Sequence, residues 1–247
     1  MVRRAAAALL AVSWTCLQGQ EIATRDSSAR PIALSTVALA FTAGSLVAST
    51  QDAAWERSIR AAGPQSSLGL RNLTSFGEHW GSQGTFIVSG ALWLGGRAFH
   101  DRVRARWGAR ALESIALSGA AAGLIKELTG RTGPYADPGH PESWAFGRGF
   151  TDGKYQSFPS GPVTFAFAFA SSMTDQISHD SPSTARWAGP ALYGVATVTA
   201  FARTYDHAHW LSDVVAGAGL GTLSGLAVGR WHRAHSGSWL DKLLLGR

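Results

Sequence analysis

The stretch ARTYDHAHWLSD, residues 202–213, lies near the C-terminal end of a chain of 247 residues. It places Arg203 six residues before His209, and Asp213 four residues after that histidine. If a helix begins near residue 210, His209 and Asp213 share one face, so the carboxylate can hold one imidazole nitrogen and leave the other free. The guanidinium of Arg203 suits phosphate oxygens, and a helix N-terminus favours anions. The pattern indicates either a phosphate site with an oriented nucleophile or an ordinary polar turn before an apolar helix.

Two segments upstream carry residue types of the same kind. The segment FPSGP, residues 158–162, precedes an apolar run, so Ser160 and Gly161 lie where a helix begins and backbone N–H groups lack helical partners. The same residues also suit plain helix capping. Lys126 is one of only three lysines, ends another apolar run and precedes the turn GRTGP at residues 130–134. A solvated cation at a helix end is the alternative reading of this lysine.

Taken in this order, the three segments resemble the signature of the type-2 phosphatidic acid phosphatase family, over about residues 80–231. That family shares its fold and site with bacterial acid phosphatases and vanadium haloperoxidases. The resemblance implies that His209 attacks phosphorus to form a phosphohistidine and that Asp213 orients its ring. It also implies a set of phosphate-binding residues: Lys126, Ser160, Gly161 and Arg203.

Two positions depart from the family pattern. Seven residues after the lysine the family has an arginine, where this chain has Gly133, and Arg131 is the candidate substitute. After Ser-Gly the family has a histidine that protonates the leaving alcohol, where this chain has Pro162. Loss of a positioned proton donor typically costs about 10²–10⁴ in rate. We therefore expect slow turnover of alkyl phosphates, and less effect on leaving groups that depart unprotonated. Three residues could stand in as proton donors: His207, Asp206 and His140.

Six apolar runs predict helices, at residues 31–50, 84–97, 111–125, 163–173, 187–201 and 214–228. The sequence thus predicts an all-α fold, a six-helix bundle of the phosphatidic acid phosphatase and haloperoxidase type, embedded in a membrane. Several runs are shorter than the ~20 residues of a membrane crossing, and mean hydropathy is +0.02. The expected organisation is a leader at 1–20, a helix and connector at 21–80, a phosphatase-like core at 81–232 and a tail at 233–247.

The N-terminus and the arginines predict a location. A charged start before a short apolar stretch is typical of a secretory signal peptide, and the single cysteine, Cys16, lies within it. Arginines concentrated in an expected connector at residues 97–110 favour the cytoplasmic side, which places the motif residues on the outward face. A cleaved leader conflicts with six simple crossings. We therefore expect a bacterial cell-envelope protein, either in the inner membrane with a periplasm-facing site or in the periplasm.

The remaining features bear on substrate and partners. The long stretch 130–158, rich in Gly, Pro and aromatic residues, is expected to roof the phosphate pocket, with a disordered connector as the alternative. Residues 51–81 are expected only to link two helices. The net charge of +6 favours anionic lipid and phosphate esters over nucleic acid, because the arginines do not line one face. No cofactor or metal is expected, since no dinucleotide-binding loop or Cys/His cluster is apparent.

The expected function is hydrolysis of phosphate monoesters or lipid phosphates through His209. Two alternatives stay open. One is a catalytically inactive homologue that binds phosphate or lipid head groups or fills a structural role. The other is haloperoxidase chemistry with bound vanadate, which the changes at Gly133 and Pro162 would also weaken.

Overall fold

The computed structural model describes residues 33–61 and 67–245, so the expected leader and Cys16 lie outside the described residues. Within these ranges the regular structure is helical, with two isolated β-bridges and no strand, which confirms the all-α prediction. The helices are α2 (Leu34–Ser49), α3 (Asp52–Ala61), α4 (Leu68–His79), α5 (Thr85–Ala98), α6 (Arg102–Thr129), α7 (Gly161–Asp180), α8 (Pro182–Tyr205), α9 (Leu211–Ala234) and α10 (Trp239–Leu245). Shorter turns are η1 (Trp80–Gly84, π-helical), η2 (Arg148–Phe150) and η3 (Gly153–Tyr155).

Each predicted apolar run falls on a helix, and α6, α7, α8 and α9 extend beyond their runs at both ends. The largest difference concerns residues 97–110, expected as a connector, because α6 already begins at Arg102. The Asp101 carboxylate caps this helix by accepting the backbone N–H of Arg104 at 3.0 Å. Most of the arginines therefore lie on the first turns of a helix, and only three residues join α5 to α6. The proposed division of the chain at residues 81 and 232 stays a prediction.

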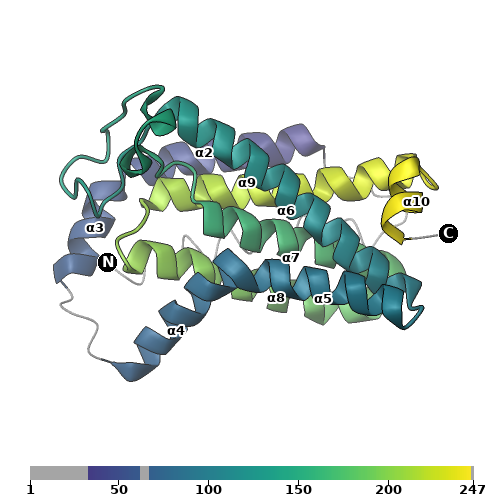
Figure 1. The fold of residues 1–247 in the computed structure, drawn as a ribbon. Helices are drawn as coiled ribbons and strands as arrows, with labels where there is room; N and C mark the ends of the chain where they lie inside the picture. Colours follow the sequence, from purple (N-terminus) through teal and green to yellow (C-terminus); the bar gives the residue numbers. More distant parts are fainter. Residues whose placement is uncertain (1–32, 62–66, 246–247) are drawn as a thin grey trace.

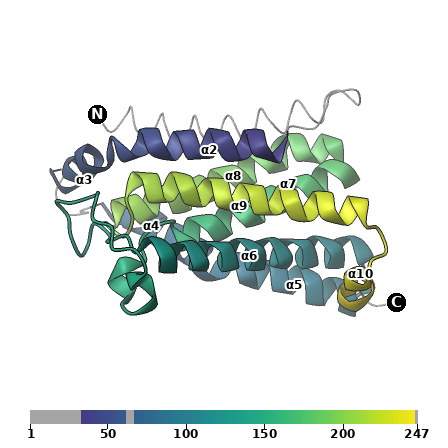
Figure 2. The same ribbon diagram turned by 90° about the horizontal axis from the view of Figure 1, so that it is seen from above.

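Helix α9 runs through the middle of the bundle, between α2, α6 and α7 (Figures 1 and 2). Glycines four residues apart let the backbone of α7 approach it. A Cβ atom would lie 2.7 Å from the Ser160 carbonyl oxygen at Gly217 and 2.3 Å from the Thr164 carbonyl oxygen at Gly221. These contacts fix the start of α7 beside the start of α9, so the motifs at residues 158–162 and 202–213 lie side by side.

Helix α9 is also the one helix among those described that is long and apolar enough to cross a membrane. Its apolar window is 72% buried inside the bundle, as a core helix requires. Helix α2 is apolar but has 16 residues, and it exposes Leu39, Leu46 and Val47. By helix length and composition, the membrane-embedded part of the prediction therefore depends on α9 alone.

The bundle has two ends with different contents (Figure 1). The site end comprises α3, the stretch 130–160, the C-termini of α6 and α8, and the N-termini of α7 and α9. The far end comprises the turn between α5 and α6, the C-terminus of α9, and α10. The helix order thus brings the three motifs to one end and the arginine-rich start of α6 to the other, as the sequence predicted.

Candidate active site

His209 lies in the short turn between α8 and α9 and is 8% exposed. The turn is fixed because the backbone N–H groups of Ala208 and His209 both donate to the Arg203 carbonyl oxygen, each at 3.1 Å. The imidazole Nδ1 donates to the carbonyl oxygen of Ser157 at 2.9 Å. This bond places the proton on Nδ1 and leaves the lone pair of Nε2 free for a reaction. The sequence did not reveal Ser157, because a backbone carbonyl carries no residue signature.

Asp213 is fully buried in the first turn of α9. Its Oδ2 accepts the Trp210 backbone N–H at 2.9 Å and the Ser157 hydroxyl at 2.6 Å. Its separation from His209 Nδ1 is 3.8 Å, which is an ion-pair distance and too long for a hydrogen bond. The expected carboxylate–imidazole pair is therefore present, but Ser157 bridges it and makes the orienting hydrogen bond.

Lys126 lies in the last turn of α6 and reaches across the start of α7. Its Nζ donates to the carbonyl oxygens of Gln156 and Ser157, the second at 3.5 Å. A Cβ atom at Gly161 would lie 3.8 Å from Lys126 Cε, so the lysine passes directly over this glycine. Burial, with the help of the Arg203 charge, lowers the pKa of Lys126 from 10.5 to about 8, and Asp213 opposes the shift. The lysine thus lies within the electrostatic reach of the other motif residues.

Arg203 and Ser160 complete the expected phosphate ligands. Arg203 lies in the last turn of α8, and its Nη1 donates to Glu78 Oε1 of α4 at 2.9 Å. The backbone N–H of Ser160 donates to the Asp213 carbonyl oxygen at 3.0 Å. The Nε of Arg203 and the hydroxyl of Ser160 are buried and have no hydrogen-bond partner among the described residues. Buried polar groups normally have partners, so both groups are free to serve a bound anion.

The electrostatics of the site favour a neutral His209. Burial lowers the pKa of its imidazole below the ordinary 6.5, and the charges of Lys126 and Arg203 lower it further. Asp213 acts in the opposite direction. At neutral pH the ring is therefore uncharged, as a nitrogen nucleophile must be.

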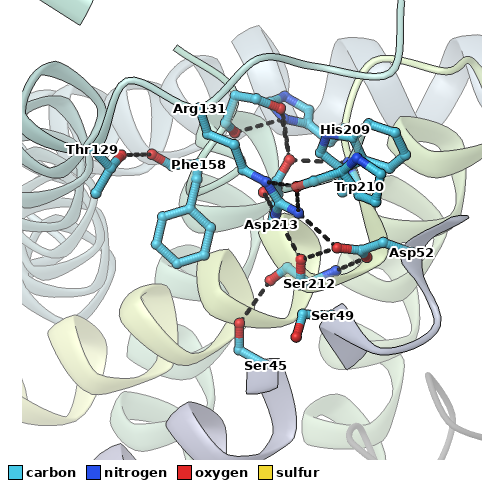
Figure 3. Close-up of polar contacts among 12 residues, drawn as sticks. Ser45, Ser49, Asp52, Thr129, Arg131, Phe158, His209, Trp210, Ser212 and Asp213 are labelled. Carbon is cyan, nitrogen blue, oxygen red and sulfur yellow. Dashed lines mark hydrogen bonds and ion pairs between the residues drawn. The ribbon is translucent and has the colours of Figure 1, made fainter. Parts of the chain in front are cut away.

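Arg131 does not occupy the place of the missing arginine. It is 2% exposed, and all three of its nitrogens are engaged. Nε and Nη2 donate to the Pro141 carbonyl oxygen at 3.0 and 2.6 Å, and Nη1 donates to Asp213 Oδ1 at 2.5 Å. The rings of Trp144 and Trp210 flank the guanidinium, with centroids 4.7 and 5.7 Å from Cζ. Figure 3 shows Arg131 directed at Asp213. The arginine therefore holds the Asp213 carboxylate beside His209 and has no free donor for phosphate.

The two changed positions both lie at the site end. A Cβ atom at Gly133 would lie 3.2 Å from Ser157 Oγ and 3.3 Å from the Ala208 carbonyl oxygen, so the position faces the turn that carries His209. Pro162 is in the first turn of α7 and packs against η1, where a Cβ atom at Gly81 would lie 3.0 Å from Pro162 Cβ. Neither position carries a side chain that can bind or protonate a substrate.

The candidate proton donors differ in their surroundings. His140 is exposed, and its Nδ1 lies 2.6 Å from Asp137. Asp206 caps the C-terminus of α8. His207 has a positive φ of 55° and is held by the buried Glu56 carboxylate, 2.9 Å from its Nδ1. His207 thus lies in the turn of His209 with its ring held by α3.

The stretch 130–158 is folded over the site. Gly130 has a φ of 60°, and a Cβ atom there would lie 1.9 Å from the Ala145 carbonyl oxygen. Arg131 forms isolated β-bridges with both Trp144 and Gln156, so the beginning, middle and end of the stretch meet at one residue. Three aromatic side chains of the stretch point outward and are largely exposed: Tyr135, Phe146 and Phe150.

Comparisons with known proteins agree with this arrangement. The family model of the PAP2 superfamily matches residues 107–236, which is more than half of the chain. The lipid A 1-phosphatase of Porphyromonas gingivalis is 38% identical over 89 residues, covering 36% of this chain and 19% of that relative. The chain thus matches about a fifth of the relative's length. No solved structure matches. With its motifs inside the matched residues and its helices in the expected order, the chain belongs to the PAP2 superfamily.

Proposed function

We propose that this protein is a phosphatase that hydrolyses a lipid phosphate by nucleophilic attack of His209 Nε2 on phosphorus. The observation that carries the proposal is the orientation of the His209 imidazole, whose Nδ1 donates to the Ser157 carbonyl oxygen and leaves Nε2 free. The charges of Lys126 and Arg203 act on this ring and favour its neutral form. A nucleophile oriented by a third group and surrounded by cations is what transfer of a phosphoryl group requires.

The reaction proceeds in two steps. In the first, Nε2 forms a bond to phosphorus, the bond from phosphorus to the ester oxygen breaks, and the leaving oxygen takes a proton from solvent water because Pro162 cannot supply one. Lys126, Arg203 and Ser160 hold the phosphoryl oxygens, while Asp213 stabilises the positive charge that the ring acquires. In the second step, water attacks phosphorus, the bond to Nε2 breaks, and inorganic phosphate leaves.

A lipid phosphate is the favoured substrate class for two reasons. The relative named above is a lipid A phosphatase. The exposed aromatic side chains of the stretch 130–158, together with a net charge of +6, suit an anionic lipid surface at the mouth of the site. We further propose that the protein resides in the bacterial cell envelope with the site end on the periplasmic side.

The change at Pro162 determines which leaving groups are accepted. Because proline has no acidic proton, alkyl phosphates lose the usual proton donor, whereas an aryl phosphate leaves as a stabilised anion. We propose that turnover is slow for simple alkyl esters. A catalytically inactive homologue is the second candidate, favoured by the lack of a cation at Gly133 and of a proton donor at residue 162.

The test is release of inorganic phosphate by the full chain in detergent, from 4-nitrophenyl phosphate and from phosphatidic acid. We expect release that vanadate inhibits, that His209→Ala abolishes, and that leaves an acid-labile phosphohistidine after quenching. The control is His235→Ala, which removes an exposed histidine at the far end and leaves release unchanged. A folded protein that releases no phosphate from either substrate would establish the inactive homologue.

A further inference from the structure

Helix α3 lies outside residues 107–236, which match the family model, and it places a row of charged residues against the site end. Asp52, Glu56 and Arg60 are four residues apart and therefore share one face of the helix. The carboxylates of Asp52 and Glu56 are buried, at 1% and 3% exposure. Residues 51–81, expected only to link two helices, thus also supply buried carboxylates, and a carboxylate is buried only where it has partners.

Those partners are all parts of the site end. The Nη2 of Arg60 donates to the Pro134 carbonyl oxygen at 3.2 Å, and Glu56 accepts from His207 at 2.9 Å. Asp52 Oδ1 accepts the backbone N–H of Ser212 at 2.9 Å, and Oδ2 accepts the Ser212 hydroxyl at 2.5 Å. Helix α3 therefore contacts the stretch 130–158, the turn of His209 and the first turn of α9 at once.

Asp52 also binds the arginine that holds Asp213. Its Oδ2 accepts Arg131 Nη2 at 2.7 Å, while Arg131 Nη1 donates to Asp213 Oδ1 at 2.5 Å and to the Ser212 hydroxyl at 2.7 Å. Figure 3 shows the guanidinium between the two carboxylates, with Ser212 below it. Because the guanidinium is a rigid planar fork, the position of one carboxylate fixes that of the other.

We propose that Asp52 is a positioning residue, which fixes the Asp213 carboxylate through Arg131 and Ser212 and so keeps it available to His209. The proposal rests on the proposed function, in which His209 is the nucleophile.

The physical reason lies in the charge balance. Arg131 paired with Asp213 alone would neutralise the carboxylate that must stabilise the imidazolium of the phosphohistidine. With Asp52 present, one positive charge faces two negative charges, so one unit of negative charge remains for the ring. Burial raises the pKa of Asp52 above its ordinary 3.8, opposed by Ser212 and Arg131, so the site holds this carboxylate at a cost to stability.

The imidazole feels charges from every element around it. They are Lys126 from α6, Arg203 from α8 and Asp213 from α9, and Arg131 from the stretch 130–158 acts in turn on Asp213. Removing the Asp52 charge leaves this set more positive, so the protonated ring becomes less stable. A residue that only caps α9 would lower stability without lowering kcat per folded molecule, and this difference makes the proposal testable.

The experiment replaces Asp52 by Asn in the full chain, which keeps the shape and removes the charge. We expect kcat for 4-nitrophenyl phosphate to fall about tenfold, with KM within about twofold because the phosphate ligands stay in place. In NMR spectra of the histidine-labelled protein, the His209 titration should move to lower pH. Asp52→Glu should recover part of kcat. The control is Asp175→Asn, which removes a buried carboxylate paired with Arg233 at 2.6 Å on the later half of α7 and should change neither quantity.

Asp52→Asn that lowers the melting temperature while leaving kcat per folded molecule and the His209 titration unchanged would overturn the proposal. If the wild type releases no phosphate, the proposed function fails, and the His209 titration in Asp52→Asn still decides whether Asp52 acts on the ring. If the Asn variant does not fold, Asp52→Glu decides, because a displaced carboxylate should lower kcat at normal KM.

Discussion

Each end of the bundle buries one arginine between carboxylates and beside a histidine. At the far end this arginine is Arg110, 3% exposed, which pairs with Glu113 at 3.0 Å and with Asp241 of α10. His232 of α9 lies between them, with Nε2 2.5 Å from Glu113 and 2.6 Å from Arg110. This cluster joins α6, α9 and α10, so it holds the last helix on the bundle.

The two ends differ in how the histidine is bound and in the sum of charges. At the far end Nε2 of His232 is hydrogen-bonded directly to the Glu113 carboxylate. At the site end His209 is instead hydrogen-bonded to a backbone carbonyl, and the Asp213 carboxylate is 3.8 Å away. The charged groups that act on His209 are Lys126, Arg203 and Asp213, two positive minus one negative charge, or +1. The far-end groups are Arg110, Glu113 and Asp241, one positive minus two negative charges, or −1. The same residue types thus fit the proposed anion site where the charges around the histidine sum to a positive value, and hold helix α10 where they sum to a negative value.

The largest expected effect comes from removing one arginine at each end. Arg203→Met should lower kcat/KM for 4-nitrophenyl phosphate by about 10²–10³, because it removes a cation aimed at the charge of the transition state. Arg110→Met should leave turnover per folded molecule unchanged and lower the free energy of unfolding by about 1–3 kcal/mol, because partly buried carboxylates lose their partner. Steady-state kinetics and chemical denaturation measure the two effects.

The distinction between the two ends would be wrong if Arg110→Met lowered turnover or Arg203→Met did not. Loss of turnover in well-folded Arg110→Met would mean that the far end takes part in the reaction. Full turnover in Arg203→Met would remove the surplus of cations as the explanation for the site.

The same contrast shows what the sequence could predict. The helices α2 and α5–α9 follow from apolar runs, and the residues of the motifs follow from their order and spacing. The partners of Arg131 do not, because Asp52 and Asp213 are 79 and 82 residues away along the chain. In the sequence alone, the row Asp52, Glu56 and Arg60 resembles the solvated face of a short helix. In the structure Asp52 and Glu56 are buried against the site end, so they hold α3 there. Helix α10 was likewise expected only as a tail.

A second prediction concerns proline at the start of a helix at each end. Pro162 is the second residue of α7 at the site end, and Pro182 is the first residue of α8 at the far end. Pro162→His should raise turnover of alkyl phosphates at least tenfold, about 1.4 kcal/mol of barrier, and change aryl phosphate turnover little. Pro182→His is the matched control and should change neither rate.

An unchanged alkyl rate in folded Pro162→His would mean that a histidine at this position does not reach the leaving group. The packing of residue 162 against Gly81 of η1 would then be the reason, because it turns the side chain away from the substrate.

The smallest expected effect is the pH dependence of kcat/KM, which reports the free enzyme. In the proposed reaction His209 attacks only when neutral. Burial lowers its pKa below 6.5, so activity should be present above that lowered pKa and fall as pH drops through it.

Lys126 is proposed to bind phosphate when protonated, so the contribution of its charge should be complete below its pKa of about 8 and lost above it. A decline of a few-fold above pH 8 should therefore appear, and Lys126→Arg should move it to higher pH because guanidinium stays protonated. The same pKa makes the free energy of unfolding rise between about pH 8 and 10.5, where the unfolded lysine binds a proton that the folded one has released. Lys126→Met should lack this rise. A decline that Lys126→Arg leaves in place would assign it to another group and leave the lysine as a structural contact to the Gln156 and Ser157 carbonyl oxygens.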